Sequence, residues 1–79
     1  MRILFFAQLK DATGCPEIEW ADAGGLSAEQ LWERLLREFP KLDGHRSCVR
    51  LARNGAYARA DEQFESGDEV ALIPPVSGG

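Results

Sequence analysis

The sequence ends with GDEVALIPPVSGG (residues 67–79), and this stretch indicates how the whole chain is organised. A turn at Gly67 precedes a short apolar run of Val, Ala, Leu and Ile, which is typical of a strand. Pro74 and Pro75 cannot donate to a strand ladder, and each restricts the residue before it, so the strand should end at Ile73. We therefore expect one domain over residues 1–73 with an extended tail over residues 74–79.

We expect the tail to be extended and slim enough to enter a cleft of another protein. At roughly 3.1 Å per residue, an extended chain from Pro74 to Gly79 reaches about 19 Å. Gly78 and Gly79 have no Cβ, so their backbone is slim enough for a narrow channel. A Gly-Gly ending alone arises by chance in about one of 200 chains. The order of strand, Pro-Pro, spacer and Gly-Gly carries more information than the dipeptide.

A helix is predicted over residues 28–39. Ser27 is a good N-cap and Gln30 completes a capping box with it, so the helix should begin at Ala28. Pro40 disfavours helical geometry at Phe39 and should end the helix. Between these signals, apolar residues at helical spacing predict one buried stripe: Ala28, Leu31, Trp32, Leu35, Leu36 and Phe39.

A first hairpin is predicted before this helix. Residues 1–9 alternate as a strand, residues 10–14 form a turn and residues 17–20 form the returning strand. In the first strand both faces carry apolar groups. Ile3, Phe5 and Ala7 share one face, whereas Leu4, Phe6 and Gln8 share the other. One face should meet the core, and the other should meet a second layer or a partner protein.

A second hairpin is predicted after the helix and a polar loop over residues 41–47. Its strands, residues 48–53 and 56–59, flank Asn54-Gly55, a strong signal for a two-residue type I′ turn. With the final strand, the order is strand, strand, helix, strand, strand, strand. This order predicts a two-layer α+β domain in which one helix crosses one face of a sheet of about five strands.

The ending IPPVSGG (residues 73–79) after GDEV (residues 67–70), together with ILFFA (residues 3–7), resembles the small, sulfur-carrying subunit of molybdopterin synthase. The resemblance spans nearly the whole chain in length and element order, and it is more specific for the sulfur-carrier class than for the pathway. It implies a ubiquitin-like β-grasp fold with a mixed sheet, in which the last strand lies beside the first and parallel to it.

The resemblance also implies a chemistry at the C-terminus. A ubiquitin-activating-like adenylyltransferase would consume ATP to convert the Gly79 carboxylate to an acyl adenylate, and a sulfur donor would displace AMP to leave a thiocarboxylate. The thiocarboxylate would donate sulfur to the pterin precursor, cyclic pyranopterin monophosphate, in the active site of the molybdopterin synthase large subunit. No cofactor would be bound permanently, since AMP and sulfur are carried transiently. The expected assembly is a heterotetramer of two small and two large subunits.

The residues expected to act fall into two groups. Gly79 is the reacting residue, and the tail that enters the channel consists of Pro74, Pro75, Val76, Ser77 and Gly78. Leu4, Phe6 and Ile73 are candidates for a hydrophobic contact with the large subunit, because contiguous exposed apolar surface on a small domain commonly marks an interaction site.

The composition and motifs of the sequence argue against several other classes of function. The chain has 79 residues, 44% of them hydrophobic, with a formal net charge of −4 and no basic run, so it lacks the footprint of a nucleic-acid binder. No stretch resembles a signal peptide, and we expect a cytoplasmic protein without membrane contact. No catalytic constellation, metal-ligand spacing or Gly-rich phosphate loop is present in the sequence. The chain is therefore expected to be a carried reactant that is not catalytic by itself and holds no metal.

Three smaller features are open to more than one interpretation. Cys15 and Cys48 are expected to be buried or half-buried thiols, and His45 has no neighbours that would make it a metal ligand. An acidic group precedes the final strand and forms either a solvated loop or a docking face for a basic partner: Asp61, Glu62, Glu65, Asp68 and Glu69.

Alternative functions remain beside the molybdopterin pathway. Sulfur carriers for thiamine or cysteine synthesis also end in Gly-Gly. A ubiquitin-like modifier would be joined to lysines through Gly79, and a plain interaction module would have a chemically silent terminus. Replacement of Gly79 should abolish function in a sulfur carrier or a modifier but not in an interaction module. A mass spectrum that detects exchange of oxygen for sulfur distinguishes the carrier from the modifier.

Overall fold

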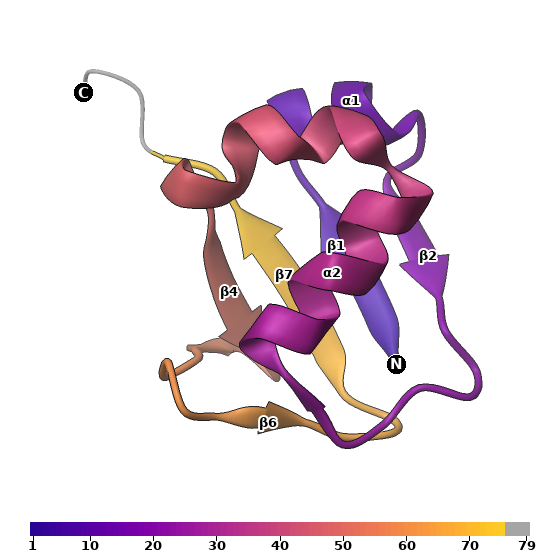
Figure 1. Ribbon diagram of the computed structural model, residues 1–79, viewed down its shortest axis with the longest axis vertical. Helices are drawn as coiled ribbons and strands as arrows, with labels where there is room; N and C mark the ends of the chain where they lie inside the picture. Colours follow the sequence, from indigo (N-terminus) through magenta and orange to yellow (C-terminus); the bar gives the residue numbers. More distant parts are fainter. Residues whose placement is uncertain (76–79) are drawn as a thin grey trace.

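A computed structural model describes residues 1–75 of the chain (Figure 1). Its main layer is a five-stranded sheet with the strand order β2-β1-β7-β4-β5. The strands are β1 Arg2–Phe5, β2 Glu17–Glu19, β4 Arg50–Arg53, β5 Ala56–Tyr57 and β7 Glu69–Ile73. β1 and β7 are parallel at the centre, and the other neighbouring strands are antiparallel. The mixed sheet and the parallel pairing of the first and last strands are confirmed.

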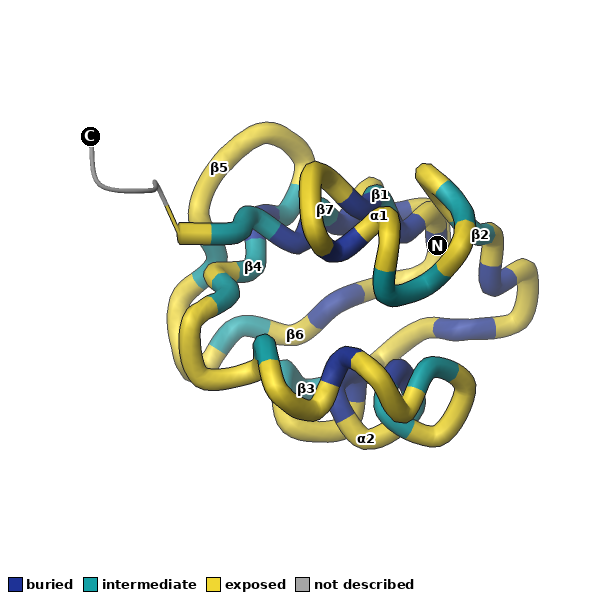
Figure 2. Tube along the Cα trace, turned by 90° about the horizontal axis from the view of Figure 1, so that it is seen from above, coloured by how far each residue is buried: buried dark blue, intermediate teal, exposed yellow. Residues whose placement is uncertain are grey.

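The helix α2 (Ala28–Glu38) forms the second layer, across one face of the sheet, as Figures 1 and 2 show. Its capping box is present: the Gln30 backbone N–H donates to Ser27 Oγ over 3.1 Å, and the Ser27 backbone N–H donates to Gln30 Oε1 over 3.0 Å. The helix ends because Phe39, which precedes Pro40, has φ −132° and ψ 78°. The predicted helix is confirmed to within one residue at its end.

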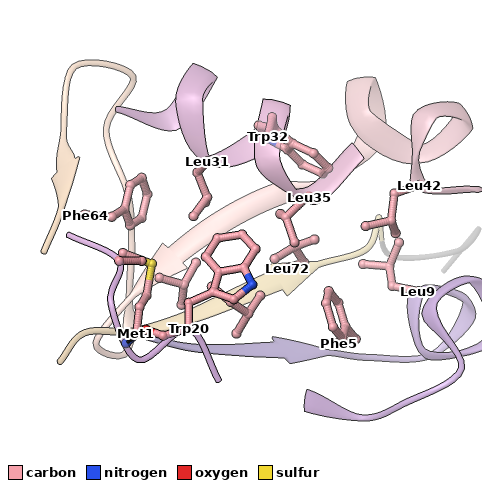
Figure 3. Packing of buried hydrophobic residues seen from close by; sticks show 13 residues of the cluster. Met1, Phe5, Leu9, Trp20, Leu31, Trp32, Leu35, Leu42, Phe64 and Leu72 are labelled. Carbon is pink, nitrogen blue, oxygen red and sulfur yellow. Dashed lines mark hydrogen bonds between the residues drawn. The ribbon is translucent and has the colours of Figure 1, made fainter. Parts of the chain in front are cut away.

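The core lies between α2 and the sheet (Figure 3). Leu31, Trp32 and Leu35 of α2 are buried, and the Phe39 ring packs edge-on to Phe5 with a centroid distance of 5.6 Å. The sheet contributes its inner face, where Ile3 lies opposite Val70. Alternation along β1 then turns Leu4 away from α2. The predicted faces of Ile3, Phe5 and Leu4 are thereby confirmed.

The predicted turn at residues 10–14 is wrong, because the chain forms the helix α1 (Gln8–Thr13) there. β1 ends at Phe5, and Ala7 reverses the chain with φ 50°, so Ala7 is exposed and does not lie on the core face as predicted. Leu9 of α1 is fully buried, and Gly14 ends the helix in a left-handed conformation with φ 79°. Burial of one leucine thus stabilises a helix too short to show helical periodicity.

The predicted polar loop at residues 41–47 is likewise helical. η1, a 3-10 helix over Pro40–Cys48, buries Leu42 against α1, where Leu9 and Leu42 approach each other in Figure 3. The strand predicted from Cys48 begins at Arg50 instead, because η1 continues to Cys48. A single buried leucine among polar neighbours again decided the local structure.

The second hairpin has the predicted turn but a shorter returning strand. Asn54 and Gly55 have φ 50° and 88°, both positive as a type I′ turn requires, and Arg53 lies opposite Ala56. β5 ends at Tyr57, two residues before the predicted end. A separate two-stranded sheet, β3 Leu26–Ser27 with β6 Gln63–Phe64, was not predicted, because two residues give no alternation pattern.

Candidate functional site

The face of the sheet that points away from α2 has an apolar hollow of about 390 Å³. We call it the outer-face hollow, and it is lined by Leu4, Phe6, Ala52, Gly55, Tyr57, Glu69, Ala71 and Ile73. The three residues proposed from the sequence as partner contacts, Leu4, Phe6 and Ile73, therefore line one continuous surface although they come from the two ends of the chain.

Strand register explains why this face is hollow. Leu4 lies opposite Ala71, which lies opposite Ala52 in the next strand. Ala52 in turn lies opposite Tyr57 at the sheet edge. The two alanines have only a Cβ and form a low floor, whereas the large side chains at the ends form walls. One row of side chains across four strands thus builds a concave apolar surface.

Tyr57 is the lining residue that sequence reasoning missed. Tyr57 is 59% exposed and Phe6 is 45% exposed, and these two are the large exposed apolar residues within residues 1–75. Apolar surface of this kind at a concave face is a recognised sign of an interaction site. A signal for Tyr57 was present, because the two-residue turn at Asn54-Gly55 fixes Ala52 opposite Tyr57 and places both on one face.

Charged residues surround the hollow. The Arg50 guanidinium lies over the Tyr57 ring, 4.5 Å from its centroid, in a cation–π contact. At the other side, Arg2 contacts Glu17 over 3.3 Å and Glu69 over 3.4 Å, and all three side chains are about half exposed. Exposed pairs of this kind add little to stability. The rim therefore has ionic groups that a partner could engage without a large cost to the fold.

The acidic residues at the start of β7 and before it are neither all part of a solvated loop nor all available as a docking face. Asp68 is only 9% exposed, and its carboxylate accepts hydrogen bonds from Arg53 Nε, from Asn54 Nδ2 over 3.1 Å and from the Glu65 backbone N–H over 2.7 Å. Glu62 accepts from Arg53 over 3.2 Å. These two carboxylates are bound within the domain, whereas the residues Asp61, Glu65 and Glu69 are exposed. The exposed Glu65 carboxylate nevertheless accepts a hydrogen bond from the Gly25 backbone N–H over 3.1 Å.

Their surroundings shift the pKa of both carboxyl groups. Burial by itself would raise the pKa of Asp68, but the hydrogen bonds from the Glu65 backbone, Asn54 and Arg53 outweigh it, and the pKa is lowered from its ordinary value. The Arg59 backbone N–H and the Arg53 side chain lower the pKa of Glu62. Both groups are therefore ionised at neutral pH and hold the Arg53 guanidinium between them.

The stem of the tail leaves the domain at the hollow. β7 ends at Ile73, which lines the hollow, and Pro74 is half-buried while Pro75 is exposed. The predictions for Val76, Ser77, Gly78 and Gly79 lie outside the described residues. The tail therefore starts directly beside the outer-face hollow.

The remaining candidate residues are not gathered into a site. Cys15 is half-buried as predicted, but Cys48 is exposed, because it ends η1 and does not enter the sheet. His45 is half-buried in η1. Within residues 1–75, no three His, Cys, Asp or Glu side chains are grouped so that they could hold a metal ion. Over the same residues, no helix is both long and apolar enough to cross a membrane.

Comparison with known proteins adds independent observations. A family model described as the ThiS family matches residues 3–79. The molybdopterin synthase sulfur carrier subunit of Arabidopsis thaliana is 35% identical over 79 residues, which is 100% of this chain and 82% of the relative.

Solved structures give the same fold. The crystal structure of SAMP1 from Haloferax volcanii has a TM-score of 0.81 at 29% identity, with 99% of this chain and 97% of that chain covered. A protein-protein complex of subunits 1 and 2 of molybdopterin-converting factor from Helicobacter pylori contains a chain with a TM-score of 0.70 at 24% identity, covering 99% of this chain and 96% of that one. The ubiquitin-like β-grasp prediction is confirmed.

Proposed function

This chain belongs to the ThiS family, and we propose that it is the sulfur carrier of molybdenum cofactor biosynthesis, with Gly79 as the residue that carries sulfur. Relatives that match the whole chain at 30% to 35% identity are named molybdopterin synthase sulfur carrier subunits. Those names favour the molybdopterin pathway over thiamine or cysteine synthesis.

The proposed chemistry takes place at the Gly79 carboxylate in two steps before sulfur is delivered. A carboxylate oxygen attacks the α-phosphorus of ATP on a ubiquitin-activating-like adenylyltransferase, and pyrophosphate leaves. A sulfur nucleophile at the oxidation level of sulfide, HS⁻, then attacks the activated carbonyl carbon, AMP leaves, and loss of a proton from sulfur gives the thiocarboxylate. Its sulfur is the nucleophile that is transferred to the pterin precursor in the large subunit. The chain itself is the carried reactant, and its partners supply catalysis.

The observation that carries this proposal is the position of the tail's stem. Ile73 is at once the last residue of β7 and part of the lining of the outer-face hollow. A large subunit bound over the hollow would therefore hold the start of the tail and direct Pro74, Pro75, Val76, Ser77 and Gly78 into its own channel. The Helicobacter pylori structure is a complex between subunits 1 and 2 of that organism's factor, which supports a two-subunit arrangement.

Reconstitution tests the proposal. The full chain is incubated with the adenylyltransferase, ATP and a sulfur source, and intact-protein mass spectrometry should show the mass increase for one oxygen replaced by sulfur. The product, mixed with the molybdopterin synthase large subunit and the pterin precursor, should yield molybdopterin. A chain that is adenylated but never acquires sulfur would contradict the proposal.

A second function has a specific observation in its favour. SAMP1 from Haloferax volcanii, whose fold this chain shares, is described as a small archaeal modifier protein. A modifier would form an isopeptide bond between the Gly79 carbonyl and a lysine amine of a target, with loss of AMP. Incubation with ATP, the adenylyltransferase and cell extract, followed by tryptic mass spectrometry for lysines joined to the C-terminal peptide of residues 60–79, separates the two, since no Lys or Arg follows Arg59. Conjugates without thiocarboxylate would favour the modifier.

A further inference from the structure

We propose that Asp68, Arg53 and Asn54 form a clamp that positions Tyr57 for binding of the large subunit, a role that rests on the proposed function. The three residues are called the hairpin clamp below. None of them belongs to the lining of the outer-face hollow. Their effect on binding would therefore pass through the hairpin that carries Tyr57.

The strand that carries Tyr57 has little support of its own. β5 has two residues, both exposed, and it pairs with β4 alone, through Ala52 opposite Tyr57 and Arg53 opposite Ala56. β7 anchors β4 on its other side, whereas β5 is an edge strand with one neighbour, so few backbone hydrogen bonds hold β5 in place. The position of the Tyr57 ring thus depends on the Arg50 guanidinium that lies over it and on the contacts that hold the turn.

Asn54 binds the turn to the start of β7. Its backbone N–H donates to the Glu69 carbonyl over 2.8 Å, and its side-chain Oδ1 accepts from the Glu69 N–H over 2.9 Å. Its Nδ2 donates to Asp68 over 3.1 Å. Glu69 itself lines the hollow, so these bonds fix the turn against the strand that leads to the tail.

Asp68 and Arg53 fix the base of the same hairpin. Arg53 Nε donates to Asp68, whose carboxylate also accepts from the Glu65 backbone, and Arg53 Nη1 donates to Glu62 over 3.2 Å. Arg53 lies opposite Val70, a fully buried residue of the inner face. By alternation, the Arg53 side chain belongs to the face that carries the core, on the opposite side of the sheet from Tyr57.

The clamp therefore supports one wall of the hollow from behind. Gly55 follows Asn54 directly and Tyr57 lies two residues further along, and together they form that wall. Leu4 and Phe6 form the other wall, from β1 and the segment after it. Loss of the clamp should free the Tyr57 wall and leave the Phe6 wall in place. This asymmetry distinguishes positioning of Tyr57 from general destabilisation of the domain.

A double-mutant cycle tests the proposal with the full chain and the purified molybdopterin synthase large subunit of the same organism. Asp68→Asn should weaken binding about tenfold, corresponding to about 1.4 kcal/mol. In a Tyr57→Ala background the same change should have almost no further effect, because the residue that the clamp positions is gone. In a Phe6→Ala background it should keep its full tenfold effect.

Two further variants provide a second test and a control. Asn54→Gly tolerates the positive φ but removes both side-chain bonds, and it should repeat the coupling if Asp68→Asn does not fold. Asp22→Asn removes an exposed carboxylate paired with Arg34, away from the hollow, and should leave binding unchanged. Equal effects of Asp68→Asn in the Tyr57→Ala and Phe6→Ala backgrounds would overturn the proposal.

Hydrogen exchange tests the positioning in the isolated chain. The Ala58 amide donates to the Leu51 carbonyl over 2.8 Å across the hairpin, and the Trp20 amide donates to the Met1 carbonyl over 2.7 Å at the opposite sheet edge. Asp68→Asn should accelerate exchange at Ala58 about tenfold more than at Trp20. Equal acceleration at both amides would overturn the clamp, whereas failure of the wild-type chain to bind the large subunit would contradict the proposed function.

Discussion

Phe5 lies directly opposite Leu72 in the parallel pairing of the first and last strands, and both side chains are buried beneath α2. The start of the chain thereby fixes the direction in which the end of the chain leaves the domain. The same pairing places Leu4 and Ala71 together on the outer face. One pair of strands thus packs the core with its inner face and forms part of the surface beside the tail with its outer face.

Leu35 tests the inner face. It is fully buried between α2 and the sheet, so Leu35→Ala should lower the free energy of unfolding by about 2–5 kcal/mol, since it leaves a cavity in the core. Urea denaturation followed by tryptophan fluorescence measures the change. Glu33→Ala, on the exposed side of the same helix, is the control and should alter stability by less than about 0.5 kcal/mol. An equally small effect of Leu35→Ala would contradict the packing described here.

Phe6 tests the outer face. It is 45% exposed and lines the hollow, so Phe6→Ala should leave the chain folded and weaken its complex with the large subunit by more than about 1 kcal/mol. Calorimetric titration gives the affinity, and circular dichroism checks the fold. A Phe6→Ala chain that unfolds would place this side chain in the core and reverse the assignment of faces.

Ala71 tests whether the hollow itself is the docking surface. It forms part of the floor, with about 390 Å³ of open space above it, so Ala71→Leu should be accommodated without loss of the fold. The larger side chain should nevertheless fill part of the hollow and weaken binding of the large subunit by about 1–3 kcal/mol, as overpacking does elsewhere. Unchanged affinity in the same titration would show that the partner binds elsewhere.

The Asp68 carboxylate of the hairpin clamp and the Glu62 carboxylate bound to Arg53 predict how stability depends on pH. The folded-state pKa values of Asp68 and Glu62 are lowered from ordinary values of 3.8 and 4.5. Their contribution is therefore fully present above those ordinary values and is lost as the pH falls through the lowered values in the folded chain. Wild type should exceed Asp68→Asn in stability at pH 7, and the difference should shrink below about pH 4. A difference that stays constant from pH 7 to pH 3 in urea titrations would contradict this role.

The sequence predicted those elements that have strong local signals. Ser27 and Gln30 fix the start of α2, and Asn54-Gly55 fixes the turn of the second hairpin, because a capping box and a type I′ turn depend on neighbouring residues alone. α1, η1 and the β3–β6 pair were missed. Each depends on burial of a single distant side chain, Leu9, Leu42 or Phe64, which no local pattern shows.

The candidate site divides in the same way. Leu4, Phe6 and Ile73 were predicted as surface contacts from alternation and from their apolar character, and they do line one hollow. Tyr57 was missed although the two-residue turn at Asn54-Gly55 fixes the register of β5 against β4 and places Tyr57 on the same face as Ala52. The internal bonding of Asp68 could not be predicted, since its partners Arg53 and Asn54 reach it only after the hairpin folds against β7.

Gly79 decides the central claim. Gly79→Ala retains a carboxylate but adds a methyl group and restricts φ, and deletion of Gly79 removes the reacting carboxylate altogether. Because the outer-face hollow is formed by residues 4–73, both variants should stay folded and bind the large subunit with an affinity within about threefold of wild type. Calorimetric titration with the purified large subunit provides this control.

The most direct measurement is molybdopterin formation by the Gly79-deleted chain with purified adenylyltransferase, ATP, a sulfur source, the large subunit and the pterin precursor. We expect a chain that binds its partner but yields no thiocarboxylate and no molybdopterin. Product formation at the wild-type rate by the Gly79-deleted chain would contradict the carrier function and leave an interaction module as the better account.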